Sequence, residues 1–336
     1  MNELLEESDG KKLLQLKKNI IDITNTIYSL SDDMKNKVLE HIRNISEKTD
    51  KIHILTDIDD TIYPSRYGGS DLSFTHHTVY PGVFSFYKYV VSTDFVTLLT
   101  ARPKSLYTDT CDKISKEIGR PVDILNGRFK DINLGVGVDF VKRLLYPLIS
   151  SKSSYPSSID HLTGLEPIKW YSNYKNIANT KFESIIKYSS IYPEFNFIFI
   201  GDSGQGDLIC AHKLYEHKSN NPDFPIKASF IHNIIKSKEA KYYRSNEKLR
   251  MIQDEEFIQS LSQKNIYLFN NYIDLAGQMC SLHIITYEVL DKIINETLTD
   301  FKENKKSSIY YQELLYISYI ENELNASSIK YTKDII

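Results

Sequence analysis

The sequence has no long apolar run, few cysteines and little net charge. No apolar stretch approaches the roughly 18 residues of a membrane-spanning helix, and the N-terminus (MNELLEESDGKK) has no apolar signal core. The three cysteines, Cys111, Cys210 and Cys280, are odd in number and far apart, so they suggest neither a disulfide framework nor a zinc motif. We therefore expect a cytoplasmic protein in a reducing compartment, with any membrane contact peripheral.

Net charge and composition indicate what type of protein this is. The net charge of −3 comes from 41 basic and 44 acidic residues, so the chain has no global signature of nucleic-acid binding, and no nucleic-acid partner is expected. Apolar residues make up 41% and charged residues 25% of the 336 positions, which excludes wholesale disorder and allows a sizeable core. At roughly 150 residues per domain, this length predicts two domains or one enlarged α/β domain.

Short β-rich runs alternate with helical stretches from residue 51 onward. The runs cover residues 51–56, 95–100, 196–201, 226–232 and 265–269, with a weaker one at 122–125. This alternation predicts an α/β fold with a Rossmann-like parallel sheet and helices on both faces. Ligands bind beyond the carboxyl ends of the strands in such sheets. Asp57, Thr100 and Asp202 each stand at or just after such an end, in three separate segments.

Helical segments are expected at both ends of the chain. Apolar residues between Leu13 and Ile27 recur at helical spacing, and residues 31–33 are natural N-cap residues for a second helix that ends near Ser46. We expect this pair to pack against the main domain. A membrane-surface helix is the alternative, which the lack of Trp and Phe on the apolar face weakens. Apolar periodicity across residues 273–298 predicts a helical C-terminal region.

These patterns divide the chain into three parts. The predicted parts are an N-terminal helical extension (1–50), an α/β domain (51–300) in which 104–180 is a candidate cap or insertion, and a C-terminal helical tail (301–336).

Two acidic turns that follow predicted strands contain the candidate catalytic and metal-binding carboxylates. Asp57 follows a buried strand, where a carboxylate can attack phosphorus if a metal and other charges keep its pKa low. Asp59 stands two residues further on, where it can protonate a leaving alkoxide. Asp202 and Asp207 flank a Gly-rich turn that suits a hard cation such as Mg²⁺. The alternative for each turn is an acidic cap of the next helix, and the matching pair of acidic strand ends weakens it.

A hydroxyl and a lysine complete the candidate set. Thr100 ends another strand, where its hydroxyl and the neighbouring amides can hold a phosphoryl oxygen. Lys181 lies in a predicted helix (TKFESII), where its ammonium can neutralise phosphate and carboxylate charge. Threonine ends many strands, and a helix lysine is usually a solvated surface charge, so only the combination is informative.

In order and spacing, these four segments resemble the haloacid dehalogenase-type phosphohydrolase superfamily. Its DxDxT motif matches Asp57–Thr61, and its strand-end Ser/Thr matches Thr100. Its lysine matches Lys181, with Lys175 as the nearest competitor, and its GDxxxxD element matches Gly201–Asp207.

A narrower resemblance covers about residues 52–298. The segments DIDDTI, TVYPGVFSFYKYV, LLTARP, TKFESI and NFIFIGDSGQGDLICAHKLYE are similar to the catalytic domain of phosphatidate phosphatases of the yeast actin-patch type, distant relatives of the lipin phosphatases. The sequence departs from that family at residues 99–103 (LTARP), where a Ser-Asn-Ser stretch is frequent. The departure bears on lipid specificity rather than on the type of reaction.

The resemblance implies a Mg²⁺-dependent phosphatase that works through an aspartyl-phosphate intermediate. Asp57 is the implied nucleophile and Asp59 the implied general acid and base, while Thr100 and Lys181 hold the transferring oxygens. The implied metal ligands are Asp57, the main-chain carbonyl of Asp59, Asp202 and Asp207, the last directly or through water. The implied substrate- or phosphate-binding residues are Asp60, Ala101 and Arg102.

The resemblance favours phosphatidate, hydrolysed to diacylglycerol at a membrane surface, as the substrate. Two alternatives stay open: a phosphatase of a soluble phosphomonoester on the same scaffold, and a catalytically silent module that only binds phosphate. No basic run, lipidation motif or aromatic-rich amphipathic helix independently indicates lipid recognition. Candidate membrane contacts are Tyr67, Phe74 and Tyr80 and the segment 146–155, all of which also have a plain packing explanation.

Overall fold

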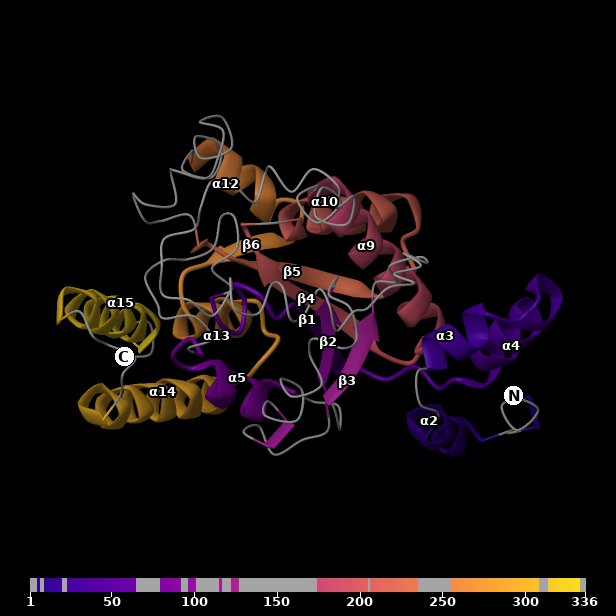
Figure 1. Cartoon of the computed structure of the whole chain (residues 1–336), viewed down its shortest axis with the longest axis horizontal. Coiled ribbons are helices and arrows are strands. Elements are labelled where there is room, and N and C mark those ends of the chain that lie inside the picture. Colours follow the sequence, from indigo (N-terminus) through magenta and orange to yellow (C-terminus); the bar gives the residue numbers. More distant parts are fainter. Residues whose placement is uncertain are drawn as a thin grey trace, which may run out of the picture.

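The computed structural model describes residues 5–6, 9–19, 23–64, 79–91, 96–100, 115–116, 122–126, 174–204, 206–234, 255–307 and 314–332. Within these residues, six parallel strands form one sheet in the order β3-β2-β1-β4-β5-β6 (Figure 1). The strands are β1 (Ile52–Thr56), β2 (Val96–Thr100), β3 (Val122–Asn126), β4 (Asn196–Asp202), β5 (Ile226–His232) and β6 (Ile266–Phe269). The predicted Rossmann-like sheet is confirmed, and each predicted run agrees with its strand to within one residue at either end.

Alternate side chains of the strands contribute to two cores, one on each face of the sheet. Ile54 and Ile198 belong to one buried cluster, and their neighbours Leu55 and Phe199 belong to the other. A sheet covered on both faces requires apolar side chains at nearly every position, which explains why the run NFIFIG does not alternate with polar residues. Each large apolar side chain that is fully buried in these cores stabilises the fold by about 1.5–3 kcal/mol.

Helices cover both faces of the sheet (Figure 1). On one side lie α5 (Val83–Val90), α13 (Tyr272–Ser281) and α14 (Tyr287–Ser307); on the other lie α9 (Tyr174–Ile191), α10 (Asp207–Asn220) and α12 (Glu255–Ser262). Helix α5 shows why these segments are helical. Its buried residues Val83, Phe86, Tyr87 and Val90 recur at the spacing of one helix face, which turns toward the sheet.

The N-terminal region is helical, as predicted, and packs against α9. Its helices are α2 (Gly10–Asn19), α3 (Ile23–Tyr28) and α4 (Asp32–Ile45), so the first predicted helix is described in two pieces. Ser31 occupies the N-cap position of α4, as expected. The buried Lys17 ammonium donates to Glu194 Oε1 at 2.6 Å and to the Ile191 carbonyl at 2.9 Å, at the end of α9. These contacts match the packing interpretation rather than the membrane-surface alternative.

The predicted C-terminal helical region is also confirmed. Helix α15 (Leu314–Thr332) lies against α13 and α14. The Tyr331 hydroxyl donates to Asp274 Oδ1 at 2.8 Å, and the Tyr331 ring lies against Gly277, where a Cβ atom would meet it at 2.3 Å. Among the described helices, none combines the length and apolar character needed to cross a membrane. The division of the chain into domains stays a prediction.

Candidate active site

The strand order places two acidic strand ends side by side. Reading across the sheet, the sequence order of the strands reverses between β1 and β4, and ligands of open parallel sheets bind outside the carboxyl ends at such a switch point. Strands β1 and β4 pair in register, with Thr56 opposite Ile200, and the Asp57 amide donates to the Ile200 carbonyl at 2.8 Å. Asp57 and Asp202 therefore stand at the edge where a ligand is expected.

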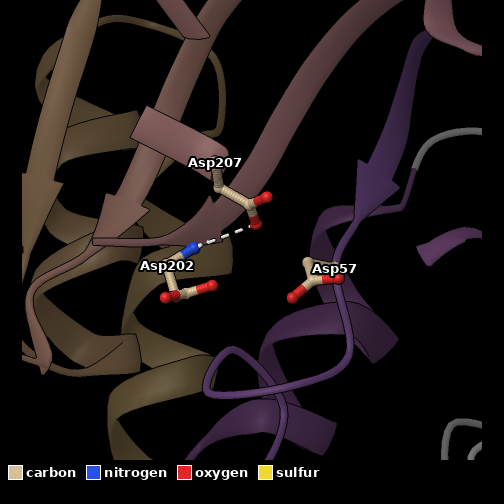
Figure 2. A group of neighbouring side chains, drawn as sticks. All are labelled: Asp57, Asp202 and Asp207. Carbon is tan, nitrogen blue, oxygen red and sulfur yellow. Dashed lines mark hydrogen bonds between the residues drawn. The ribbon is translucent and has the colours of Figure 1, made fainter. Parts of the chain in front are cut away.

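Three carboxyl groups converge at this switch point. Asp57, Asp202 and Asp207 each offer an oxygen that lies within 4.8 Å of the other two, and all three side chains are buried. Figure 2 shows the three groups turned toward one another, with Asp57, which follows β1, facing Asp202 at the end of β4 and Asp207 at the start of α10. The structure thus brings together the three aspartates whose side chains the resemblance implies as metal ligands.

Two features position Asp207: a hydrogen bond from a backbone amide, and the absence of a side chain at Gly201. Asp207 begins α10, and its Oδ2 accepts a hydrogen bond from the Asp202 amide at 3.2 Å (Figure 2). A Cβ atom on Gly201 would lie 2.3 Å from the same oxygen. Glycine is therefore required at position 201 because the Asp207 carboxylate occupies the space that any side chain would fill. The Gly204 amide donates to Asp202 Oδ1 and fixes that carboxylate as well.

Lys181 enters the cluster from α9. Its ammonium lies 2.7 Å from Asp57 Oδ1 and 2.5 Å from Asp207 Oδ1, and the side chain is buried. Lys175, the competing candidate in the sequence, is exposed on the same helix. The geometry therefore selects Lys181 as the lysine that meets the aspartates.

The cluster carries more negative than positive charge. Burial raises the pKa of Asp57 well above its usual range, the Lys181 ammonium lowers it, and the Asp207 and Asp59 carboxylates raise it further. Burial and then the Asp207 carboxylate raise the pKa of Asp202 in the same way. Burial lowers the pKa of Lys181, but attraction to Asp207, Asp57 and Asp202 outweighs this and raises it above its ordinary value. One ammonium is thus shared among several carboxylates, and a bound cation would balance the remainder.

The donor set fits a hard divalent cation. All three side chains offer carboxylate oxygens, which Mg²⁺ and Ca²⁺ prefer over nitrogen or sulfur ligands. Both oxygens of Asp207 already accept hydrogen bonds, one from Lys181 and one from the Asp202 amide. Asp57 and Asp202 are therefore better placed as direct ligands, while Asp207 pairs with Lys181.

The turn that follows β1 carries the two remaining acidic candidates. Asp59 is buried, forms a β-bridge with Tyr63, and lies near enough to Asp57 to raise its pKa. Asp60 adopts a left-handed backbone conformation (φ 58°), which aspartate tolerates better than most residues. Its amide donates to the Tyr63 carbonyl at 2.7 Å, and its carboxylate adds to the charge that raises the pKa of Asp202.

His232 is a neighbour of the site that sequence analysis missed. It ends β5 opposite Asp202, and its Nδ1 lies 2.8 Å from the Asp60 carbonyl oxygen. A single histidine inside a strand matches no motif. The only signal in the sequence was its position at a strand end, which it shares with Asp57 and Asp202.

Several sequence candidates remain without a structural test. The backbone of Thr100 ends β2, next to β1, while Ala101 and Arg102 lie outside the described residues, as does most of the candidate cap at 104–180. The candidate membrane contacts Tyr67, Phe74 and 146–155 also lie outside them. Tyr80 is buried and packs edge-on against His232, with ring centroids 4.7 Å apart, so the packing explanation holds for this residue.

Comparisons with protein-family models, curated proteins and solved structures found no match.

Proposed function

We propose that this protein is a Mg²⁺-dependent phosphomonoester hydrolase in which Asp57 forms an aspartyl-phosphate. One observation carries the proposal: Asp57 stands at the switch point of the sheet, paired with Lys181 at 2.7 Å and grouped with Asp202 and Asp207. The resemblance of these motifs to haloacid dehalogenase-type phosphohydrolases supports the same chemistry.

Asp57 is the proposed nucleophile. Its oxygen attacks phosphorus as the bond from phosphorus to the leaving oxygen breaks. Lys181 favours the ionised form of Asp57, because its ammonium lowers the pKa of that carboxyl against the effect of burial. Asp57 and Asp202, with Asp207 beside them, would hold Mg²⁺. When bound, the ion supplies positive charge that offsets the repulsion between the carboxylate and a phosphate dianion.

Asp59 is the proposed general acid and base. Its proton goes to the leaving oxygen while the aspartyl-phosphate forms, and in the second step it takes a proton from the water that attacks phosphorus. Inorganic phosphate then leaves, and the Asp57 carboxylate is regenerated. The position of Asp59 on the buried turn two residues after Asp57 supports this assignment.

The proposed substrate is phosphatidate, with contact at a membrane surface. Support comes from the resemblance of the GDSGQGD turn and of the YPGVFSFY segment to phosphatidate phosphatases of the yeast actin-patch type. The first of these segments supplies Asp202 and Asp207, and the second begins α5.

The test is phosphate release from phosphatidate in mixed micelles beside soluble monoesters, such as glycerol 3-phosphate, glucose 6-phosphate and AMP. Each substrate is assayed with Mg²⁺ and with a chelator, using wild-type protein and Asp57→Asn. We expect Mg²⁺-dependent release that Asp57→Asn abolishes, with phosphatidate hydrolysed fastest and in proportion to its surface mole fraction. Hydrolysis of soluble esters alone would exclude the lipid substrate. Phosphate binding without turnover of any ester would favour a silent module.

A further inference from the structure

Hydrogen bonds within the turn that carries Asp57 and Asp59 fix part of its backbone. After β1 ends at Thr56, the Ile62 amide donates to the Ile58 carbonyl at 2.9 Å, and the Asp60 amide donates to the Tyr63 carbonyl at 2.7 Å. Asp60 also sits in the left-handed region of backbone conformation, which is unfavourable for a residue with a side chain. Contacts from outside also hold the turn: the Tyr272 hydroxyl donates to the Thr61 carbonyl at 2.9 Å, and the Tyr80 amide donates to the Ile62 carbonyl at 3.0 Å.

His232 supplies such a contact. Its Nδ1 lies 2.8 Å from the Asp60 carbonyl oxygen. A carbonyl oxygen can only accept a hydrogen bond, so the imidazole must carry a proton on Nδ1 and donate it. The bond reaches across 172 residues of sequence and joins the end of β5 to the turn after β1.

The same residue also holds the turn after β4. The His232 carbonyl accepts a hydrogen bond from the Ser203 amide at 2.9 Å, directly after Asp202. The imidazole ring itself is fixed on two sides. It stacks on Phe269 with centroids 5.0 Å apart and 16° between the planes, and Tyr80 meets it edge-on at 4.7 Å. One buried residue at the end of β5 thus contacts both acidic turns, the first through its imidazole and the second through its main-chain carbonyl.

We propose that His232 is a positioning residue whose Nδ1–H fixes the turn of Asp57 and Asp59 relative to Asp202. This inference deepens the proposed function and rests on it, because the turns matter for turnover only if the aspartates are catalytic. Two hydrogen bonds of one buried residue support it: the imidazole contacts the turn of Asp57 and Asp59, and the main-chain carbonyl contacts the turn after β4. Loss of the imidazole donor should loosen the nucleophile and the general acid without removing a group that touches the substrate.

The test uses variants that separate the effect of the hydrogen-bond donor from the effect of the packed aromatic ring. His232→Phe keeps an aromatic ring between Tyr80 and Phe269 but has no donor. His232→Asn loses the ring and keeps a nitrogen donor the same number of bonds from Cα as Nδ1. His53→Phe is the matched control. His53 is also buried, stacks on Phe195 with centroids 5.3 Å apart, and hydrogen-bonds Thr97 of β2, but it lies near the amino end of β1, away from Asp57.

Two readouts are needed for each variant. The first is kcat and KM with 4-nitrophenyl phosphate and Mg²⁺. The second is hydrogen exchange of the backbone amides in residues 57–63, measured without substrate. For His232→Phe we expect kcat to fall about tenfold, KM to change by less than about twofold, and exchange in this turn to accelerate about tenfold. His232→Asn should recover most of both losses, and His53→Phe should leave both readouts at the wild-type level.

The outcomes are distinguishable from a failure of the proposed function. Equal impairment of His232→Phe and His232→Asn would overturn the role of the donor, as would wild-type exchange in His232→Phe. If His232→Phe does not fold, His232→Gln replaces it, since its amide nitrogen lies one bond further out and should not restore the contact. Absence of turnover in the wild-type protein would refute the proposed function, while exchange in residues 57–63 still decides the role of His232.

Discussion

Removing the Lys181 ammonium should destabilise the fold substantially. Its Nζ lies 2.7 Å from Asp57 Oδ1 and 2.5 Å from Asp207 Oδ1, and all three side chains are almost completely buried. At an effective dielectric constant of about 20, each contact supplies about 6 kcal/mol of attraction before the cost of desolvation is subtracted. Loss of one partner from a buried pair has a net cost of about 3–5 kcal/mol, because the remaining carboxylates are left uncompensated.

The variant for this prediction is Lys181→Met, which keeps the length and the apolar stem of the side chain. In a chelator, its unfolding temperature should fall by about 6–10 °C, at roughly 2 °C per kcal/mol for a chain of this size. Lys175→Met is the control, since Lys175 is exposed on the same helix and its replacement should cost less than about 0.5 kcal/mol. Added Mg²⁺ should recover part of the loss in Lys181→Met, because a bound cation replaces the missing charge.

The decisive comparison is between the two methionine variants without metal. If Lys181→Met and Lys175→Met unfold at the same temperature, the buried ion pairs of Lys181 contribute nothing and the charge reasoning is wrong. If Mg²⁺ stabilises Lys175→Met but not Lys181→Met, the lysine rather than the aspartates governs metal binding.

Three further substitutions test other parts of the structure. Gly201→Ala should displace Asp207, whose oxygen lies 2.3 Å from the new Cβ position, and should lower metal affinity about 10-fold or more, as measured by calorimetry. Asp57→Asn should lower turnover by at least about a thousandfold but keep or raise the unfolding temperature in chelator, because the raised pKa of Asp57 means that the site favours a neutral group. Lys17→Met should cost about 3–5 kcal/mol in denaturant unfolding by breaking the buried pair with Glu194. Turnover should stay at the wild-type level, since Glu194 lies just before β4 and Asp202 stands at the other end of that strand.

The strands and the acidic strand ends could be predicted because their signals are local. A run such as NFIFIG, followed at once by Asp202, contains both the buried strand and the carboxylate at its end. The parallel arrangement places Asp57 and Asp202 at the same edge of the sheet, and the strand order, which only the structure gives, makes them neighbours. The choice of Lys181 over Lys175 rested on a motif resemblance, and it is the structure that places Lys181 against Asp57.

Contacts between distant segments could not be predicted from the sequence. The bond from His232 to the Asp60 carbonyl joins residues 172 positions apart, and no sequence motif links these two residues. Gly201 stands next to Asp202 in the sequence, but only the structure shows that it leaves space for the side chain of Asp207. The attachment of the N-terminal helices through Lys17 likewise depends on a partner 177 residues away.

The central claim is that Asp57 becomes covalently phosphorylated during turnover, and acid quenching tests it most directly. Wild-type protein, Asp59→Asn and Asp57→Asn are mixed with phosphomonoester and Mg²⁺, quenched in acid within the first turnover, digested and analysed by mass spectrometry. The account predicts phosphate on the peptide that contains Asp57, accumulating in Asp59→Asn because hydrolysis of the intermediate is slowed, and none in Asp57→Asn. Turnover by Asp57→Asn at a rate near that of the wild-type protein, or phosphate found only on another residue, would contradict it.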